Sequence, residues 1–194
     1  FHHSGDVPGG SSYTHTLTAP LPGVKPGDYY VIVRSDILNH IPESSEANNA
    51  GASIDQSSID VEVLVSKVPK NGTLATGQSA FYRIDVAAEE TMLVTLDGAS
   101  GSAVNELYVR FGEVPTRANF DIGFDEAFSP DQEITVPFTE AGTYYILVYG
   151  NSVPLGPQPY SIVAEILEFG IRSVDTNVGG NTGTVTVEVL GAKY

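Results

Sequence analysis

Five carboxylates lie in one short stretch of the sequence and together could bind a divalent cation. They are Asp121, Asp125, Glu126, Asp131 and Glu133, and the phenylalanines of the same stretch are Phe120, Phe124 and Phe128. Carboxylate oxygens are the ligands that calcium prefers. Charges this close repel each other unless a cation neutralises them or they spread in solvent. Two interpretations are therefore open: a calcium site, or a solvated acidic loop anchored by its phenylalanines.

A second polar cluster lies nearer the amino terminus. Asp36, Glu43 and Glu46 could offer oxygen ligands to calcium, but the regular spacing of a calcium-binding loop is missing. Asp, Asn and Ser side chains also bond to nearby backbone amides and thereby fix turns. We expect this cluster to stabilise a turn, with a metal site as the alternative.

The residues needed for catalysis are scarce. All four histidines (His2, His3, His15 and His40) fall within the first forty residues, and there is no cysteine. The absence of cysteine excludes thiol catalysis, disulfides and thiolate zinc sites. The sequence motifs of zinc proteases, serine hydrolases, phosphate-binding loops and dinucleotide-binding folds are also missing. We expect no enzyme activity in this segment, and no catalytic or cofactor-binding residues.

The charge of the chain limits its partners. Lys and Arg number 9 against 24 Asp and Glu, a formal net charge of −15. Such a surface repels nucleic acid and disfavours anionic membranes. No run approaches the roughly 18 apolar residues that a membrane span needs.

Several tyrosines could line a carbohydrate-binding face, or could belong to a core. They are Tyr108, Tyr144, Tyr145, Tyr149 and Tyr160. Since side chains alternate along a strand, we expect Tyr145 and Tyr149 to share one face and Tyr144 to lie on the other.

The pattern of the whole chain predicts strands rather than helices, because apolar and polar residues alternate with period two. The expected strands are Tyr13–Thr18, Tyr29–Ser35, Ile59–Val65, Ala80–Val86, Met92–Leu96, Glu106–Phe111, Glu133–Phe138, Tyr144–Tyr149, Tyr160–Ile166 and Thr184–Leu190. Turn signals separate them, among them Asn71-Gly72, Asp97-Gly98 and Ala141-Gly142. The predicted fold class is all-β, with tandem antiparallel β-sandwiches.

The stretch PGDYYVIVRSDILNHIPESSEANNA (residues 26–50) resembles part of a CARDB module, a bacterial cell-adhesion-related Ig-like domain. The matching positions are Gly27, Tyr29, Asp36, Asn39, Glu43, Glu46, Asn48 and Asn49. The opening strands of that family have no counterpart here, so the resemblance implies a partial Ig-like module.

A longer stretch resembles the bacterial pre-peptidase C-terminal (PPC) domain, a jelly-roll-like β-sandwich appended to secreted proteases. The similar segments are GQSAFYRIDV, TMLVTLDG, ELYVRFGEVPT and AGTYYILVYG. Relatives often carry Gly-Asp-x-Asp before Leu-Tyr-Val, whereas residues 103–106 read Ala-Val-Asn-Glu. If those aspartates hold a metal in relatives, this chain departs from that role.

These resemblances divide the chain into three parts. Residues 1–66 form the partial CARDB-like module, residues 67–167 the PPC-like sandwich, and residues 168–194 the opening strands of a further Ig-like module or a donor-like tail strand. Unpaired strand edges at one end and the tail valines Val185, Val187 and Val189 at the other could pair by β-strand addition.

The expected function is that of a non-catalytic structural or adhesive segment of a secreted or cell-surface bacterial protein. Two alternatives are an accessory module of a secreted hydrolase, for maturation or substrate attachment, and a subunit of an extracellular filament. The expected partners are neighbouring modules of the same polypeptide or identical subunits, with extracellular matrix or polysaccharide as further candidates. The sequence indicates no cofactor other than the calcium that the acidic loop could bind.

Overall fold

The computed structural model describes residues 12, 14–38, 40, 47, 49–168, 170–175, 183–184 and 186–192. In these residues there is no α-helix, and therefore no helix that is long and apolar enough to cross a membrane. The strands are β1 (Gly27–Tyr29), β2 (Ile32–Arg34), β3 (Ala50–Ala52), β4 (Ser57–Ile59), β5 (Glu62–Val63), β6 (Lys70–Leu74), β7 (Ser79–Val86), β8 (Thr91–Gly98), β9 (Val104–Phe111), β10 (Ile122–Gly123), β11 (Gln132–Val136), β12 (Gly142–Ser152), β13 (Gln158–Leu167), β14 (Gly170–Asp175) and β15 (Glu188–Ala192).

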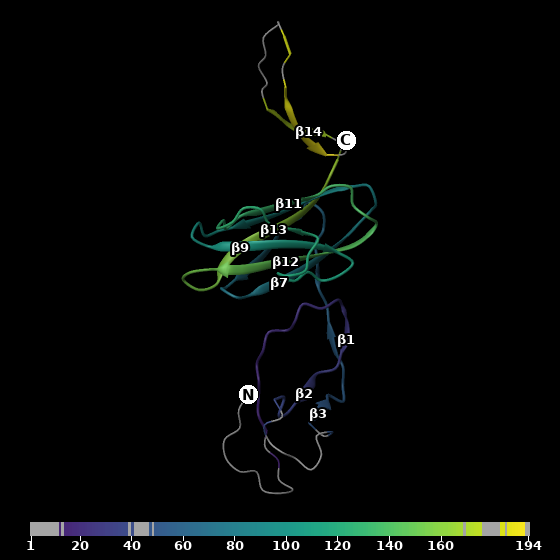
Figure 1. The fold of residues 1–194 in the computed structure, drawn as a ribbon, viewed down its shortest axis with the longest axis vertical. Coiled ribbons are helices and arrows are strands. Elements are labelled where there is room, and N and C mark those ends of the chain that lie inside the picture. Colours follow the sequence, from purple (N-terminus) through teal and green to yellow (C-terminus); the bar gives the residue numbers. More distant parts are fainter. Residues whose placement is uncertain are drawn as a thin grey trace.

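Two sheets pack face to face in the middle of the chain (Figure 1). One has the strand order β10-β9-β12-β7-β5, and the other has the order β11-β8-β13-β6. Every pairing in them is antiparallel except that of β5 with β7. The expected all-β sandwich is confirmed.

The core lies between the two sheets and follows from the alternation along each strand. Residues that point inward are apolar, and their outward neighbours are more polar, so pairing the strands collects the apolar set in one layer. The side chains buried there include Ile84, Met92, Val94, Leu96, Leu107, Val109, Ile134, Ile146, Val148, Ile162 and Ala164.

The sequence located the long strands of the sandwich correctly, and its errors are local. Residues 14–18 form no strand, and the expected strand at Tyr29–Ser35 is two short strands, β1 and β2. The Asn71-Gly72 turn is wrong, because both residues lie inside β6. Glycine fits at position 72 because the strand packs closely against Tyr160 on the paired strand: a Cβ at this position would lie 2.6 Å from the tyrosine ring.

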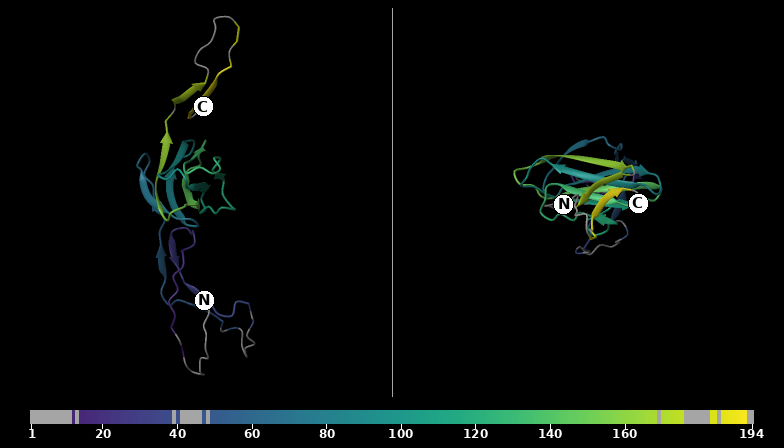
Figure 2. Two further views of the ribbon diagram at one scale, coloured as in Figure 1. Left: turned by 90° about the vertical axis from the view of Figure 1, so that its left-hand side faces the viewer. Right: turned by 90° about the horizontal axis from the view of Figure 1, so that it is seen from above.

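The residues on either side of the sandwich form smaller, open ladders. β1 pairs with β4, β2 with β3, and β14 with β15, each as a two-stranded antiparallel sheet. Large apolar side chains are exposed on the amino-terminal ladders, among them Ile32, Val33 and Ile54. Both side views place these ladders and the β14–β15 hairpin at opposite ends of the sandwich (Figures 1 and 2).

The join between the first ladders and the sandwich lies at β5. This strand pairs with β7 through Glu62↔Tyr82 and Val63↔Arg83. Val61 and Leu64, on either side of β5, are buried. The five-stranded sheet thus takes its edge strand from residues that precede the expected domain start at residue 67.

Candidate functional site

The five carboxylates of the acidic loop do not converge on one point in the structure. Asp121 accepts a hydrogen bond from the backbone N–H of Phe111 (2.8 Å), and Asp131 accepts one from that of Gly98 (2.8 Å). Asp125 and Glu126 are exposed, and Glu133 faces solvent from β11. Throughout the described part of the chain, no three Asp, Glu, His or Cys side chains gather as a metal site would need.

The phenylalanines of this loop have different environments. Phe120 lies 4.8 Å from the ring of Tyr108, centroid to centroid, and Phe124 meets the same ring edge-on at 5.6 Å. Phe128 is 85% exposed. Two of the three therefore anchor the loop on the sandwich, as the solvated-loop interpretation expects.

Two buried amide side chains organise the other end of the loop. Gln132 donates hydrogen bonds to the backbone carbonyls of Asn105 (2.9 Å) and Glu126 (2.8 Å), and Asn105 donates to that of Pro130 (2.8 Å). The side-chain oxygens of both Asn105 and Gln132 are buried and accept no hydrogen bond. Sequence reasoning did not identify either residue.

The Asp36 cluster behaves as a turn where the structure describes it. Asp36 accepts a hydrogen bond from the backbone N–H of His40 (2.8 Å), and the backbone N–H of Ser35 bonds to the carbonyl of Asn49 (2.8 Å). Glu43 and Glu46, the other candidate ligands of this cluster, lie outside the described residues, as do Asn39 and Asn48. His15 and His40 are exposed and lie outside the sandwich.

A charged cluster that the sequence analysis missed lies on the outer face of the five-stranded sheet, the face turned away from the core. Glu106 on β9 has only 5% of its side chain exposed, and Arg117 from the following loop binds it through two hydrogen bonds of 2.6 and 2.7 Å. The guanidinium also lies over the ring of Tyr149, 4.2 Å from its centroid. This two-point geometry neutralises a carboxylate that could not otherwise be buried.

Tyr108 completes this cluster. Its hydroxyl donates to Glu106 (2.7 Å). Burial and then this hydrogen bond raise the pKa of Tyr108 to about 12, and the bonds to Glu106 raise the pKa of Arg117 above its ordinary value. Tyr108 is therefore neutral and Arg117 is charged at neutral pH. The alternation in ELYVRF, which places Glu106 and Tyr108 on one face, was the signal that could have revealed it.

The tyrosines divide between the two faces of the sheet as expected. Tyr144 joins the inner core and Tyr145 a small outer cluster with Val61, Val114 and Phe81. Tyr160 is also in the core, where its hydroxyl bonds to that of Tyr82, and burial raises the pKa of both groups. Tyr108 and Tyr145 are buried as well, so Tyr149 is the one of these five tyrosines that is partly exposed.

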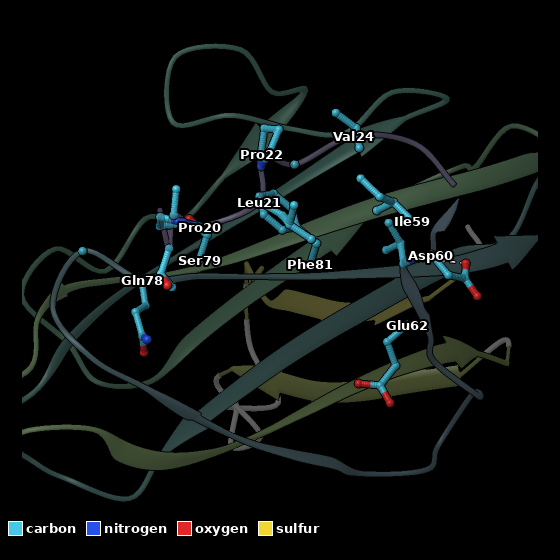
Figure 3. Close-up of a pocket in the computed structure, with 15 residues that line it drawn as sticks. Pro20, Leu21, Pro22, Val24, Ile59, Asp60, Glu62, Gln78, Ser79 and Phe81 are labelled. Carbon is cyan, nitrogen blue, oxygen red and sulfur yellow. Dashed lines mark hydrogen bonds between the residues drawn. The ribbon is translucent and has the colours of Figure 1, made fainter. Parts of the chain in front are cut away.

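A groove of about 830 Å³ lies where β5 separates from β7, and we call it the β7 groove. Its three walls are the start of β7 (residues 77–81), the β4–β5 connection (residues 59–62) and the extended segment 18–24 (Figure 3). Most of the lining is apolar, with Leu21, Pro22 and Phe81 prominent. The volume is in the range of known ligand sites.

Comparison with known proteins assigns the central sandwich. Residues 78–150 match the family model of the bacterial pre-peptidase C-terminal domain. Alkaline serine exoprotease A of Vibrio alginolyticus is 36% identical over 90 residues, which are 46% of this chain and 16% of that protein. The central sandwich has the PPC domain fold.

Solved structures of low sequence identity also align with the PPC domain. The pre-peptidase C-terminal domain of a Bacillus anthracis collagenase is 15% identical, with a TM-score of 0.44 over 55% of this chain and 95% of that domain. A periplasmic inhibitor of g-type lysozyme from Aeromonas hydrophila is 20% identical, with a TM-score of 0.42 over 55% of this chain and 96% of its own.

The central sandwich departs from the Gly-Asp-x-Asp pattern that the resemblance implies for residues 103–106. Val104 and Glu106 stand at the positions where that pattern has aspartates. Asn105 and Glu106 form structural bonds here. Asn105 ties β9 to the backbone at Pro130, and the charge of Glu106 is neutralised by Arg117. The side chain of Glu106 is therefore already fully engaged within the domain.

Proposed function

We propose that this chain is a non-catalytic structural segment of a secreted or cell-surface protein, in which the PPC domain separates and joins neighbouring modules. The observation that carries this proposal is the position of the connections. The chain enters the five-stranded sheet at β5 and leaves the four-stranded sheet at the end of β13, and its flanking ladders extend from opposite ends (Figure 1). A domain connected in this way holds its two neighbouring modules apart along its long axis.

The amino-terminal ladders support the same role. The CARDB-like residues Gly27 and Tyr29 lie in β1, and Asp36 closes the turn after β2. We propose that residues 26–50 belong to an Ig-like adhesion module that precedes the PPC domain in a tandem array. The exoprotease relative supports the alternative of an accessory module in a secreted hydrolase.

The test combines shape with activity. Small-angle X-ray scattering of the whole chain should give an elongated particle, and a panel of peptide, ester and glycoside substrates should show no turnover. A compact particle would contradict the spacer, and turnover that His40→Ala abolishes would contradict the non-catalytic assignment.

A second candidate function is assembly with identical subunits, and the exposed apolar residues of the flanks favour it. The exposed apolar residues are Ile32, Val33 and Ile54 at one end and Val174 and Val189 at the other. They lie on or beside ladders that have two strands each among the described residues. Strand addition between the ends of successive subunits would cover both and build a filament. Light scattering after size-exclusion chromatography tests it, because a chain that ends at Leu167 should then lose the association.

A further inference from the structure

The first half of β7 has an open edge. β5 pairs with β7 only at Tyr82 and Arg83, so among the described residues Ser79–Phe81 pair with β12 alone. The carbonyl of Arg83 accepts a hydrogen bond from Leu64 on the β5 side (2.8 Å). Because backbone groups alternate between the two edges of a strand, those of Phe81 and Ser79 face the same side as Arg83. This side is the β7 groove.

The groove stays open because β5 is held away from the rest of β7. Arg83 donates a hydrogen bond from Nε to the carbonyl of Val61 (3.1 Å) and lies 3.5 Å from Asp60, which fixes the chain where it turns toward β4. On the far wall, Gly23 lies against Phe81 so closely that a Cβ would come within 2.4 Å of the ring. The segment 18–24 forms this wall, with Leu21 and Pro22 near Phe81 (Figure 3).

The residues that line the β7 groove indicate which kind of ligand it can bind. An open strand edge supplies backbone hydrogen bonds in register, and the apolar wall of Leu21, Pro22 and Phe81 accepts every second side chain of an added strand. The charged residues of the lining, Asp60 and Glu62, are both acidic. Arg83 lies 3.5 Å from Asp60 and Lys70 forms an ion pair with Glu62, so the negative potential at the groove comes mainly from the net charge of −15 of the whole chain. The groove therefore favours a basic ligand over an acidic one.

We propose that the β7 groove binds an extended, basic peptide segment of a partner protein, which adds as a strand to β7 at Ser79–Phe81. Its alternate side chains are apolar and contact Phe81 and Leu21, and a lysine or arginine lies near Asp60 and Glu62. The spacer role proposed above does not require this groove, so the two proposals stand or fall separately.

The probe is the blocked pentapeptide Lys-Val-Thr-Val-Lys, added to the whole chain labelled with nitrogen-15. We expect it to shift the backbone amides of Ser79 and Phe81 and to slow their hydrogen exchange about tenfold, since added-strand bonds protect amides. The same peptide with proline in place of threonine lacks the central N–H and should not bind. The version with glutamates in place of lysines should bind more weakly.

Five substitutions distinguish the contribution of the strand edge to binding from that of the acidic side chains. Ser79→Pro removes an N–H that faces the groove and no β7–β12 bond, so peptide binding should weaken at least about tenfold at an unchanged melting midpoint. Ser79→Thr keeps the N–H and should bind as the unaltered chain does. Asp60→Asn and Glu62→Gln should each weaken binding roughly two- to fivefold, as exposed charges do, and Glu140→Gln, at the other end of β12, should have no effect.

The mapping on the unaltered chain decides the outcome even if Ser79→Pro fails to fold. Amide shifts that centre on Ser79–Phe81 and otherwise reach only residues lining the β7 groove support the proposal. Shifts away from the groove, equal binding of the three peptides, or no binding at millimolar concentration overturn it. So does a shift of the same amides by cellohexaose but not by the peptide, which would make the groove a carbohydrate site.

Discussion

The PPC domain and the ladders beside it are built from similar strands but differ in what those strands bury. In the sandwich, Ile146 on β12 is fully buried, whereas Ile32 on β2 is 71% exposed and Ile54, in the bend between β3 and β4, is 96% exposed. Both regions pair their strands antiparallel. The difference is the second sheet: two strands alone cannot cover an apolar face, and only the stacking of two larger sheets does so. The alternation of apolar and polar residues therefore predicts that strands pair, whereas burial of their apolar side chains requires a second sheet.

The largest expected effect comes from removing an apolar side chain on each side of this comparison. Ile146→Ala leaves a cavity in a packed core and should lower the free energy of unfolding by about 2–5 kcal/mol. Ile54→Ala removes contact with little besides solvent and should change it by less than about 0.5 kcal/mol. Urea unfolding of both variants, followed by circular dichroism, measures the two changes.

Equal effects of the two substitutions would break the comparison. A large loss from Ile54→Ala would mean that the amino-terminal ladders are covered in solution, by a neighbouring copy or by residues outside the described part of the chain. The concentration dependence of the midpoint then distinguishes association from a contact within one chain.

A pair of glycines sharpens the comparison at the level of single atoms. Gly72→Ala in β6 would place a Cβ 2.6 Å from the ring of Tyr160 and should cost about 1–3 kcal/mol through overpacking. Gly51→Ala in β3 meets no atom within 4 Å and should be neutral or slightly stabilising, because alanine reduces the entropy of the unfolded chain. Thermal melts of the two variants test the prediction, and an unchanged midpoint for Gly72→Ala would show that Tyr160 can move aside.

The close approach of Gly72 to Tyr160 also shows where prediction of the strands from sequence succeeds and where it fails. Long alternating strands such as β8 and β12 were predictable, because their periodicity is set by which residues face the core. The strand at Lys70–Leu74 was not, since its glycine reads as a turn unless the ring of Tyr160 on another strand is known. β5 lies within the expected strand Ile59–Val65, but its parallel pairing with β7 was not predictable, because a connection separates the two strands and only the folded sheet brings them together.

The candidate sites show the same limit. Acidic residues close in sequence were easy to find, but neighbours along a loop point in different directions, and their partners came from the backbone of β8 and β9. The ion pair of Glu106 and Arg117 was missed, because eleven positions and a loop separate its members and only the outer face of the sheet unites them. Alternation places Glu106 on that face and says nothing of the loop that covers it.

Arg117→Ala tests whether the outer face contributes to stability as the core does. The variant leaves the buried carboxylate of Glu106 without its two-point partner, and hydrogen bonds to charged groups are worth about 1.5–3 kcal/mol. Half of the arginine side chain is exposed, so we expect a smaller loss of about 1–2 kcal/mol. Arg117→Lys should retain only part of the stability that Arg117→Ala loses, since an ammonium cannot form both bonds in the plane of the carboxylate.

The matched control for this prediction is Arg34→Ala on the exposed strand β2, which should leave stability unchanged. Chemical unfolding at low and at high salt completes the measurement. A loss that disappears at high salt would identify the Arg117 pair as an ordinary surface ion pair.

The smallest effect, an absence of change, is expected for calcium at the acidic loop. Calcium takes six to eight oxygens that converge on one point, whereas Asp121 and Asp131 are bonded to backbone amides of different strands. The unpaired side-chain oxygens of Asn105 and Gln132 are neutral, and a water would satisfy them. Melting midpoints in calcium, in magnesium and in chelator should therefore agree. A ligand present at 100 times its dissociation constant would add about 2.7 kcal/mol, so a real site would be obvious. A rise in calcium alone that Asp131→Asn removes would establish the calcium site, with the oxygens of Asn105 and Gln132 as its first candidate ligands.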